Sequence, residues 1–286
     1  MRIAVLGARG QLGAAIVHEC AGRHEAIAFD HAALDLTDDG AVAAAMESTR
    51  PEVIVNCAAY NDVDGAEDHA VDALNVNAFA VRALARAASA LDATLVHYST
   101  DFVFDGTAAD PYVETDAPNP RSTYAASKLI GEWFAADAPR AYVLRVESLF
   151  GRAPGGRPAK GSVESILRAL AAGDEARVFD DRTVSPTYVV DGARATLALV
   201  ERNAPAGVYH CVNSGHCTWF EFAEEMARQL DVTPHLKATR MTDLKFRADR
   251  PLYCALSNHK LASAGVAMPT WQDAISRYLA SRNRGE

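Results

Sequence analysis

The sequence has few cysteines and no long apolar segment. Its five cysteines are scattered over 286 residues without a Cys-x-x-Cys pair, and their odd number argues against a disulfide framework. No stretch approaches the ~20 apolar residues that cross a bilayer. The apolar run from Ile3 to Leu6 is too short for a signal peptide. These absences predict a soluble, cytoplasmic protein with reduced thiols and no membrane contact.

Basic charge is also scarce. The chain has 28 Lys and Arg against 37 Asp and Glu, a formal net charge of -9. Nucleic-acid-binding surfaces are usually basic, so no nucleic-acid partner is expected. His210, Cys211, His216 and Cys217 lie close together in the sequence, but their spacing fits no standard zinc pattern. No metal site is predicted.

The first half of the chain alternates short β-branched apolar runs with alanine-rich helical stretches. Strands are expected at 2–7, 26–30, 53–58, 94–99 and 141–146, and helices at 11–21, 38–49, 68–91 and 123–136. This alternation is typical of a parallel sheet covered on both faces. It predicts an α/β, Rossmann-like doubly wound fold that binds ligands at the carboxyl ends of its strands.

After Gly151 the alternation of strands and helices becomes less regular. A Gly/Pro-rich loop is expected at 152–161, followed by helices at 162–172, 219–230 and 271–281 and a strand at 208–212. We expect residues 1–150 to form the dinucleotide-binding Rossmann domain, with later segments returning to it. Residues 151–286 are expected to form mainly a smaller C-terminal α/β lobe that binds the substrate.

A glycine-rich turn lies between the first expected strand and the first expected helix. Its spacing, Gly-x-x-Gly-x-x-Gly, places glycines where the backbone must turn tightly and approach a pyrophosphate, while the helix N-terminus supplies free amides. The predicted cofactor contacts in this turn are Gly7, Arg9, Gly10, Gln11, Leu12 and Gly13.

The residues after the second expected strand bear on the choice of cofactor. Asp30 lies ~20 residues beyond the glycines, where a carboxylate binds the ribose hydroxyls of NAD(H). Arg9 and His31 are instead suited to the 2′-phosphate of NADP(H), so the predicted cofactor is NADPH or NADH. Asp35 and Leu36 fall where a loop can flank the adenine, or where a turn caps the next helix.

Tyr124 and Lys128 lie four residues apart on an expected helix, so the phenol and the ammonium share one face. A nearby ammonium favours the phenolate and lowers the pKa of a tyrosine from its free value of ~10. Ser99 and Thr100 end a strand at the ligand edge, where the Thr100 hydroxyl can bond the oxygen that Tyr124 protonates. Asn77 is either functional, through a water or a backbone carbonyl, or polar surface.

Together these motifs resemble the extended short-chain dehydrogenase/reductase superfamily. The resemblance rests on the glycine turn, residues 56–60, residues 99–106, and Tyr124 with Lys128. Residues 63–67, 185–188, 250–251 and 260–261 are similar to the dTDP-4-dehydrorhamnose reductase family, and the similarity covers nearly the whole chain.

The resemblance implies reduction of the 4-keto group of a nucleotide-linked 6-deoxysugar by NADPH or NADH. Tyr124 is then the proton donor, Lys128 binds the nicotinamide ribose, and Thr100 bonds the carbonyl oxygen. A nucleotide sugar is the implied partner, and a homodimer is compatible with the family. Further implied cofactor contacts are Ala58, Ala59, Tyr60, Asn77 and Ser99.

The chain departs from the family pattern where the sugar should bind. The family usually reads Arg-Thr-Ser-Trp-Val-Tyr-Gly at 145–151, whereas this chain places Ser148 at the tryptophan and adds Glu147. Phe102 replaces a tyrosine, and Arg182 a glutamine. The predicted substrate contacts are Asp101, Phe102, Val63, Glu147, Ser148, Arg182 and Arg250, with Lys160 as a further phosphate contact.

Two alternatives to a reductase stay open. Dehydratases of this fold carry a glutamate where this chain has Phe102, so dehydration is disfavoured, but an epimerase needs only the Tyr/Lys apparatus. The other alternative is a non-catalytic NADP-binding regulatory subunit, like the one that accompanies methionine adenosyltransferase. The presence of Thr100, Tyr124 and Lys128 favours the reductase.

Overall fold

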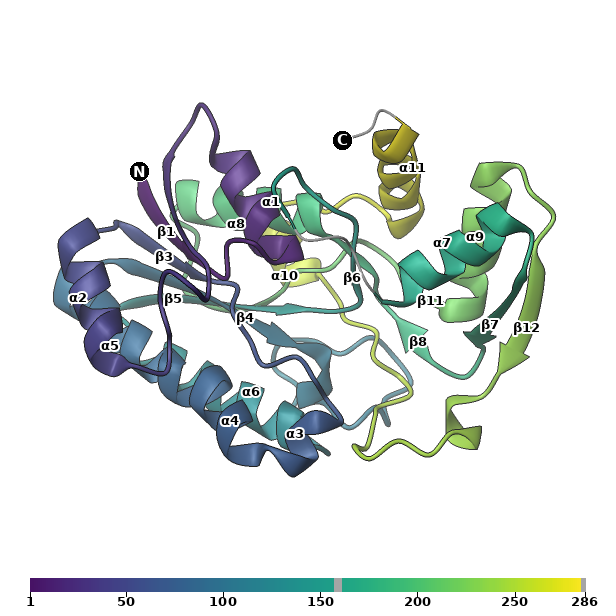
Figure 1. Cartoon of the computed structure of the whole chain (residues 1–286), viewed down its shortest axis with the longest axis horizontal. Helices are drawn as coiled ribbons and strands as arrows, with labels where there is room; N and C mark the ends of the chain where they lie inside the picture. The colour runs from purple at the N-terminus through teal and green to yellow at the C-terminus, as the bar shows by residue number, and fades with distance from the viewer. Residues whose placement is uncertain (157–160, 284–286) are drawn as a thin grey trace.

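The computed structural model describes residues 1–156 and 161–283, so Lys160 and part of the loop expected at 152–161 lie outside the described residues. A six-stranded parallel sheet forms the centre of the described part, in the order β10-β5-β4-β3-β1-β2 (Figure 1). Its strands are β1 (Arg2–Leu6), β2 (Glu25–Phe29), β3 (Val53–Asn56), β4 (Thr94–Thr100), β5 (Arg140–Val146) and β10 (Gly207–His210).

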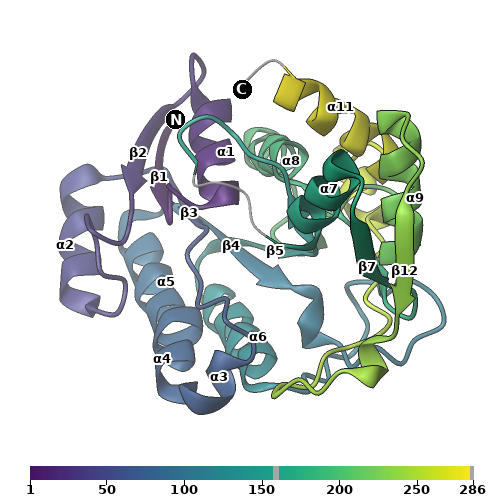
Figure 2. The same ribbon diagram turned by 45° about the vertical axis from the view of Figure 1, so that its right-hand side comes forward.

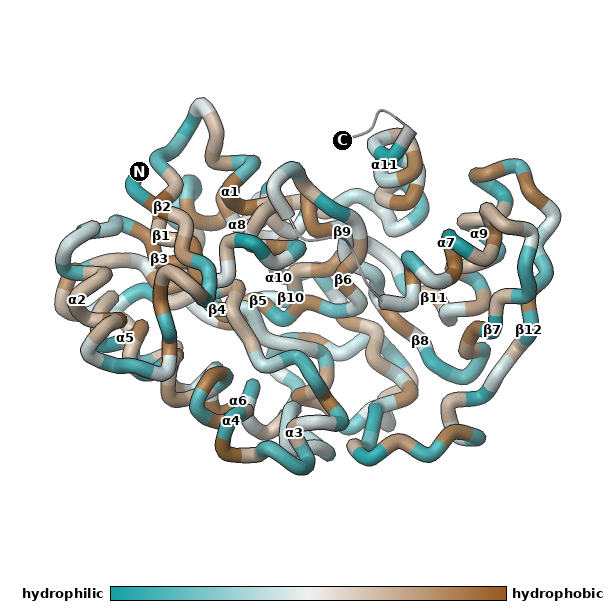
Figure 3. Tube along the Cα trace, in the orientation of Figure 1, coloured by the Kyte–Doolittle hydropathy of each residue, from teal (hydrophilic) through white to brown (hydrophobic). Residues whose placement is uncertain are grey.

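Helices cover both faces of this sheet (Figure 1). One face packs against α1 (Gln11–Cys20), α8 (Val189–Glu201) and α10 (His259–Ser263), and the other against α2 (Asp39–Thr49), α5 (Ala80–Leu91) and α6 (Thr123–Ala135). Because helices cover both faces, the central strands β3 and β4 are buried along their whole length. Many of the outer loops are hydrophilic (Figure 3). The predicted Rossmann-like doubly wound fold is confirmed.

The strand order determines where the ligand-binding crevice lies. β1 lies between β2 and β3. The connection from β1 to β2 therefore runs to one side of β1, and the connection from β2 to β3 crosses to its other side. Open α/β sheets bind ligands at such a switch point, outside the carboxyl ends of the strands. Gly7, directly after β1, and the segment after β3 therefore face the same crevice.

The predicted helix over 68–91 is confirmed from Ala70 onward, but it is not one uniform α-helix and it does not include the break at His69. The structure has α3 (Gly65–Asp68), α4 (Ala70–Leu74), a π-helical turn η1 (Asn75–Phe79) and then α5. His69, with φ -121° and ψ 47°, leaves the helical region and separates α3 from α4. Within η1, the buried Asn77 side chain bonds the backbone of Tyr60 and the hydroxyl of Ser127. These tertiary bonds account for the irregular turn, a feature that often marks functional sites.

The remaining described residues form smaller units beside the sheet (Figure 2). The helices α7 (Ser162–Ala172), α9 (Trp219–Leu230) and α11 (Trp271–Asn283) enclose an apolar core with Phe222 and Tyr278. Three short strand pairs join them: β7 (Glu175–Phe179) with β12 (His235–Thr239), β8 (Thr183–Val184) with β11 (Cys217–Thr218), and β6 (Leu149–Phe150) with β9 (Thr187–Tyr188). The 3-10 turns are η2 (Asp101–Val103) and η3 (Met241–Asp243).

Two sequence expectations concern features outside the sheet. Cys20, Cys57, Cys211, Cys217 and Cys254 all lie in the described part of the chain and are free thiols. Among the described residues, no helix combines the length and the apolar character that crossing a membrane requires.

Candidate active site

The glycine turn after β1 brings its backbone against the segment after β3. Gly7 adopts a left-handed φ of +71°, and a Cβ atom there would lie 2.9 Å from the Ala58 nitrogen. Gly13 lies in α1, where a Cβ atom would be 2.3 Å from the Gly7 carbonyl oxygen. Both positions therefore require glycine, which leaves the start of α1 open to an approaching anion.

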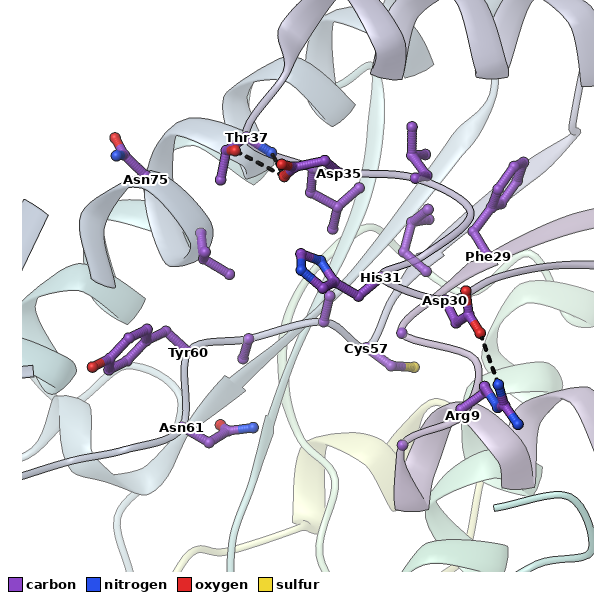
Figure 4. A pocket seen from close by; sticks show the side chains of 18 of the residues that line it. Arg9, Phe29, Asp30, His31, Asp35, Thr37, Cys57, Tyr60, Asn61 and Asn75 are labelled. Atoms are coloured by element: carbon purple, nitrogen blue, oxygen red, sulfur yellow. Dashed lines mark hydrogen bonds and ion pairs between the residues drawn. The ribbon is translucent and has the colours of Figure 1, made fainter. Parts of the chain in front are cut away.

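A cavity of about 580 Å³ extends from this turn along the carboxyl ends of β1, β2 and β3. The predicted cofactor residues that line it are Gly7, Arg9, Gly10, Asp30, His31, Asp35, Leu36, Ala58, Ala59 and Tyr60. Figure 4 shows the side chains of His31, Tyr60 and Asn61 around this cavity. The sequence therefore identified one continuous pocket from residues of four separate segments.

Several residues of the cavity wall were not predicted. They are Leu6, Phe29, Leu34, Thr37, Cys57, Asn61, Asp72, Asn75 and Val76. Leu6, Phe29 and Cys57 lie at strand ends, a signal that the sequence did contain. Asn75 and Val76 belong to η1, which the sequence did not reveal.

Asp30 and Arg9 point toward each other at the edge of this cavity (Figure 4). The Arg9 Nη1 atom donates to Asp30 Oδ2 at 3.3 Å, and the backbone amides of Ala32 and Ala33 donate to Asp30 Oδ1. The Ala33 amide and the Arg9 side chain hold the pKa of Asp30 below its ordinary value. A carboxylate and a guanidinium thus meet where a ribose with or without a 2′-phosphate would lie.

Seven predicted cofactor residues do not line this cavity: Gln11, Leu12, Gly13, Asn77, Ser99, Tyr124 and Lys128. Asn77 is buried and bonds Tyr60 and Ser127, so it fixes the loop that carries Tyr60. Gln11 Nε2 donates to the Gly151 carbonyl at 3.0 Å, and Leu12 packs in the apolar core between α1 and the sheet.

The Tyr124/Lys128 pair is fixed by the first turns of α6. Ser122 caps this helix by accepting a hydrogen bond from the Ala125 amide. Both Tyr124 and Lys128 are buried, and the Lys128 ammonium donates to the Tyr98 carbonyl of β4 at 2.6 Å. Tyr124 packs edge-on against Phe102, with ring centroids 5.8 Å apart. The helix and β4 therefore hold phenol and ammonium at one edge of the sheet.

The pKa of Tyr124 is raised, in contrast to the lowering expected from Lys128. Burial is the main cause and the charge of Asp101 adds to it, while a hydrogen bond with Thr100 acts in the opposite direction. Burial also lowers the pKa of Lys128 to about 8, against the opposing influence of Glu132 and Cys57. Tyr124 is therefore a protonated phenol at neutral pH, the form that a proton donor needs.

Thr100 and Asp101 come at the end of β4, beside β5. The Thr100 hydroxyl donates to Asp101 Oδ1 at 2.9 Å and accepts from the Phe102 amide. Ser99 is buried as well. Tyr124, Thr100 and Asp101 thus form a connected polar group at the carboxyl edge of the sheet.

The residues predicted to contact the substrate divide into two groups. Around Asp101, the Arg182 guanidinium lies 3.8 Å from the carboxylate and 5.3 Å over the Phe102 ring, and Glu147 follows β5. Ser148 is half-buried with a left-handed φ of 45°.

The second group lies near the loop after β3. Arg250 donates to Asp64 Oδ2 at 2.6 Å, and Val63 packs against a cluster that contains Tyr124, Phe102 and Tyr60. Because Tyr60 also lines the cavity, this cluster joins the Tyr124 group to the predicted cofactor pocket.

A glycine turn at a switch point and a buried Tyr/Lys pair on α6 define a Rossmann-like dehydrogenase/reductase of the extended short-chain type. Within that class the chain belongs to the family described as RmlD substrate binding domain, whose model matches residues 1–284.

Named relatives and solved structures agree with this assignment. The chain is 36% identical to the dTDP-4-dehydrorhamnose reductase of Mycobacterium tuberculosis (strain CDC 1551 / Oshkosh), over 98% of this chain and 93% of the relative. It is 35% identical to a probable dTDP-4,6-dihydroxy-2-methyloxan-3-one 4-ketoreductase of Streptomyces antibioticus, over 96% and 93%. The Bacillus anthracis dTDP-4-dehydrorhamnose reductase, solved in complex with NADP, superposes with a TM-score of 0.91 at 31% identity, over 98% and 99%.

Proposed function

We propose that this protein uses NADPH or NADH to reduce the 4-keto group of a nucleotide-linked 6-deoxysugar. The observation that carries the proposal is the buried group of Tyr124, Lys128 and Thr100, which adjoins a dinucleotide-sized cavity. Phe102 stands where a dehydratase would need an acid. The names of the mycobacterial and Streptomyces relatives support a dTDP-linked keto sugar as the substrate class.

The residues around the cavity fit a dinucleotide. The left-handed Gly7 leaves room where a Cβ atom would collide with Ala58, and the start of α1 offers free amides to a pyrophosphate. Asp30, with Arg9 and His31 beside it, would meet the adenosine ribose. When bound, the cofactor supplies the hydride.

Each catalytic side chain has a role that its surroundings support. Tyr124 donates a proton to the developing alkoxide, because burial keeps its phenol protonated. Lys128, held by the Tyr98 carbonyl, presents an ammonium to the nicotinamide ribose. Thr100 bonds the substrate oxygen after its hydroxyl turns from Asp101. Ordered donors at a developing negative charge supply much of such a rate enhancement.

The sugar would contact the group that departs from the family pattern. Phe102 and Ser148 offer an apolar ring and a small side chain, beside a polar cluster of the buried Asp101 and Glu147 and the half-buried Arg182. Val63 and Arg250 approach from the loop after β3 and from the C-terminal half.

The proposed organisation is a dinucleotide-binding domain within residues 1–150 and a substrate lobe mainly within 151–286. The separate apolar core around Phe222 supports this division, and β10 and α8 are the later segments that return to the sheet. The free cysteines support a location in the reducing cytoplasm. A homodimer stays a prediction from the family resemblance.

A substrate panel tests the proposed reaction. The purified protein is incubated with dTDP-, UDP-, GDP- and CDP-linked 4-keto-6-deoxysugars, and the absorbance of NADPH and of NADH is followed. We expect oxidation with at least one nucleotide sugar. Binding of the cofactor without turnover of any sugar, together with co-purification of another enzyme, would instead support a regulatory subunit.

Replacing Tyr124 by phenylalanine removes the proposed proton donor and little else. Tyr124→Phe should lower turnover by at least ~100-fold, the usual contribution of a positioned acid, while cofactor affinity measured by fluorescence titration stays near that of the wild type. Turnover that is unchanged in this variant would refute the assignment of Tyr124.

A further inference from the structure

Two buried carboxyl groups lie together behind the proposed catalytic group. Thr100 of β4 is paired with Val146 of β5 in the parallel register, so the next residues on the two strands are Asp101 and Glu147. Both side chains are buried, with residue exposures of 4% and 2%. One oxygen or sulfur atom from each of Asp101, Glu147 and Cys254 lies within 4.8 Å of the others.

Two of the four carboxylate oxygens of this pair have no hydrogen-bond partner within the described residues. Glu147 Oε2 accepts from the Ser185 amide at 2.6 Å, and Asp101 Oδ1 accepts from the Thr100 hydroxyl at 2.9 Å. Glu147 Oε1 and Asp101 Oδ2 are buried without a hydrogen-bond partner. Two ionised carboxylates beside one guanidinium, with Glu147 Oε1 unpaired, would be costly. One proton on the pair removes a charge and creates a donor.

Among the described residues, the pair has one neighbouring cation, which balances the charge of one carboxylate. Arg182 lies 3.8 Å from Asp101 and donates to Cys254 Sγ at 3.7 Å. The other titratable groups facing the pair are Cys254, Cys217, Tyr253 and Tyr124, all neutral at pH 7 because burial raises their pKa values. Arg182 thus already supplies a cation beside Asp101 and Cys254, which argues against a metal ion bound by the same three side chains.

We infer that Asp101 and Glu147 together hold one proton at neutral pH, carried on Glu147 Oε1, and that Glu147 is a positioning residue for Thr100. The protonated Glu147 leaves Asp101 as the ionised acceptor that holds the Thr100 hydroxyl before the substrate binds, and from which the hydroxyl then turns to the substrate oxygen. Burial and the negative charge of Asp101 both raise the pKa of Glu147, in agreement with this assignment. Glu147 stands where the resembling family usually has serine, so this arrangement is a feature of this chain.

Infrared spectroscopy tests the shared proton without reference to activity. The difference spectrum between the wild type and Glu147→Gln should contain the C=O band of a protonated carboxylic acid at pH 7. The matched control is Glu224→Gln, which makes the same change at an exposed position of α9 and should leave that band in place. Absence of the band in the wild type, or its persistence in Glu147→Gln, would overturn the inference.

Metal analysis of the same samples supplies an independent test. We expect the wild type, after purification without chelator, to contain no stoichiometric divalent metal. A tightly bound metal that is lost in Glu147→Gln would overturn the shared proton in favour of a metal site.

Measuring the activity of Glu147 variants tests the positioning role, and this test rests on the proposed reductase function. A glutamine retains a donor beside Asp101, so Glu147→Gln should keep kcat within about threefold of the wild type, whereas Glu147→Ala should lower it about tenfold or more because a buried partner is lost. Glu147→Ser, the family-like residue, is a second variant for which we expect an intermediate loss. Equal loss in the glutamine and alanine variants, with intact folding by circular dichroism, would overturn the positioning role. An inactive wild type would refute the reductase function and leave the infrared result standing.

Discussion

Lys128 carries a buried ammonium that the fold tolerates at a cost in stability. Its pKa of about 8 in the folded protein lies below its ordinary value of 10.5. Between these two pH values the unfolded chain binds more protons than the folded one, so this residue makes stability rise with pH in that window. Below pH 8 the folded protein retains the charge at a cost of ~3 kcal/mol.

Replacement of Lys128 by methionine therefore separates stability from activity. Lys128→Met should raise the melting temperature at pH 7, because relief of the buried charge outweighs the lost hydrogen bond to the Tyr98 carbonyl. The same variant should abolish turnover. The gain should shrink as the pH rises toward 10, which differential scanning calorimetry across this range measures. The exposed Lys237→Met on β12 is the control and should show no such pH dependence. A variant less stable than the wild type at pH 7 would contradict this account.

Residues whose roles follow from local backbone geometry could be predicted from the sequence. Gly7 and Asp30 line the cavity as expected, because a strand followed by a glycine turn places them at the switch point. The raised pKa of Tyr124 could not be predicted, since it depends on burial and on Asp101 rather than on the spacing to Lys128. Asn77 bonds the backbone of Tyr60, which fits the backbone-carbonyl alternative for this residue, while its contact with the cofactor stays a prediction.

At the level of elements, the close contact between α6 and η1 holds the active-site helix in place. A Cβ atom on Gly131 of α6 would lie 2.1 Å from the Asn77 carbonyl oxygen of η1. Gly131→Ala should therefore force the two elements apart and lower the free energy of unfolding by ~1–3 kcal/mol. Urea-induced unfolding followed by circular dichroism measures this loss.

Gly192 of α8 provides a matched control for the Gly131 variant. It is also a helical glycine, but a Cβ atom there would meet its nearest neighbour, a Leu12 methyl group, at an ordinary 3.5 Å. Gly192→Ala should be neutral or stabilising by up to ~1 kcal/mol, because alanine favours the helix. Equal losses in the two variants would show that the approach of α6 to η1 does not limit stability.

The elements with regular patterns were predicted closely, and the irregular ones were not. The helices α7 and α9 have the expected bounds, Ser162–Ala172 and Trp219–Leu230. The break at His69 and the turn η1 lack a proline or glycine signal, because the bonds that account for η1 come from Tyr60 and Ser127. Similarly, the adjacency of Asp101 and Glu147 follows from strand register, which the sequence suggests only after the strand order is known.

At the scale of the whole molecule, the sheet connects segments that are far apart in the sequence. β10 forms the edge of the sheet next to β5, and α8 packs against α1 on one face. The sequence predicted that later segments return to the first domain without identifying their partners. The cavity lies at the switch point between β2, β1 and β3, and the proposed catalytic group lies beside it, at the ends of β4 and β5.

The central claim is that this arrangement performs net reduction. The most direct test is to measure NAD(P)H oxidised and sugar product formed together, with a dTDP-linked 4-keto-6-deoxysugar and the wild-type protein. The account predicts equal amounts of oxidised cofactor and reduced sugar, and neither in Tyr124→Phe. Formation of an isomerised sugar without net consumption of NAD(P)H would contradict the account and identify an epimerase.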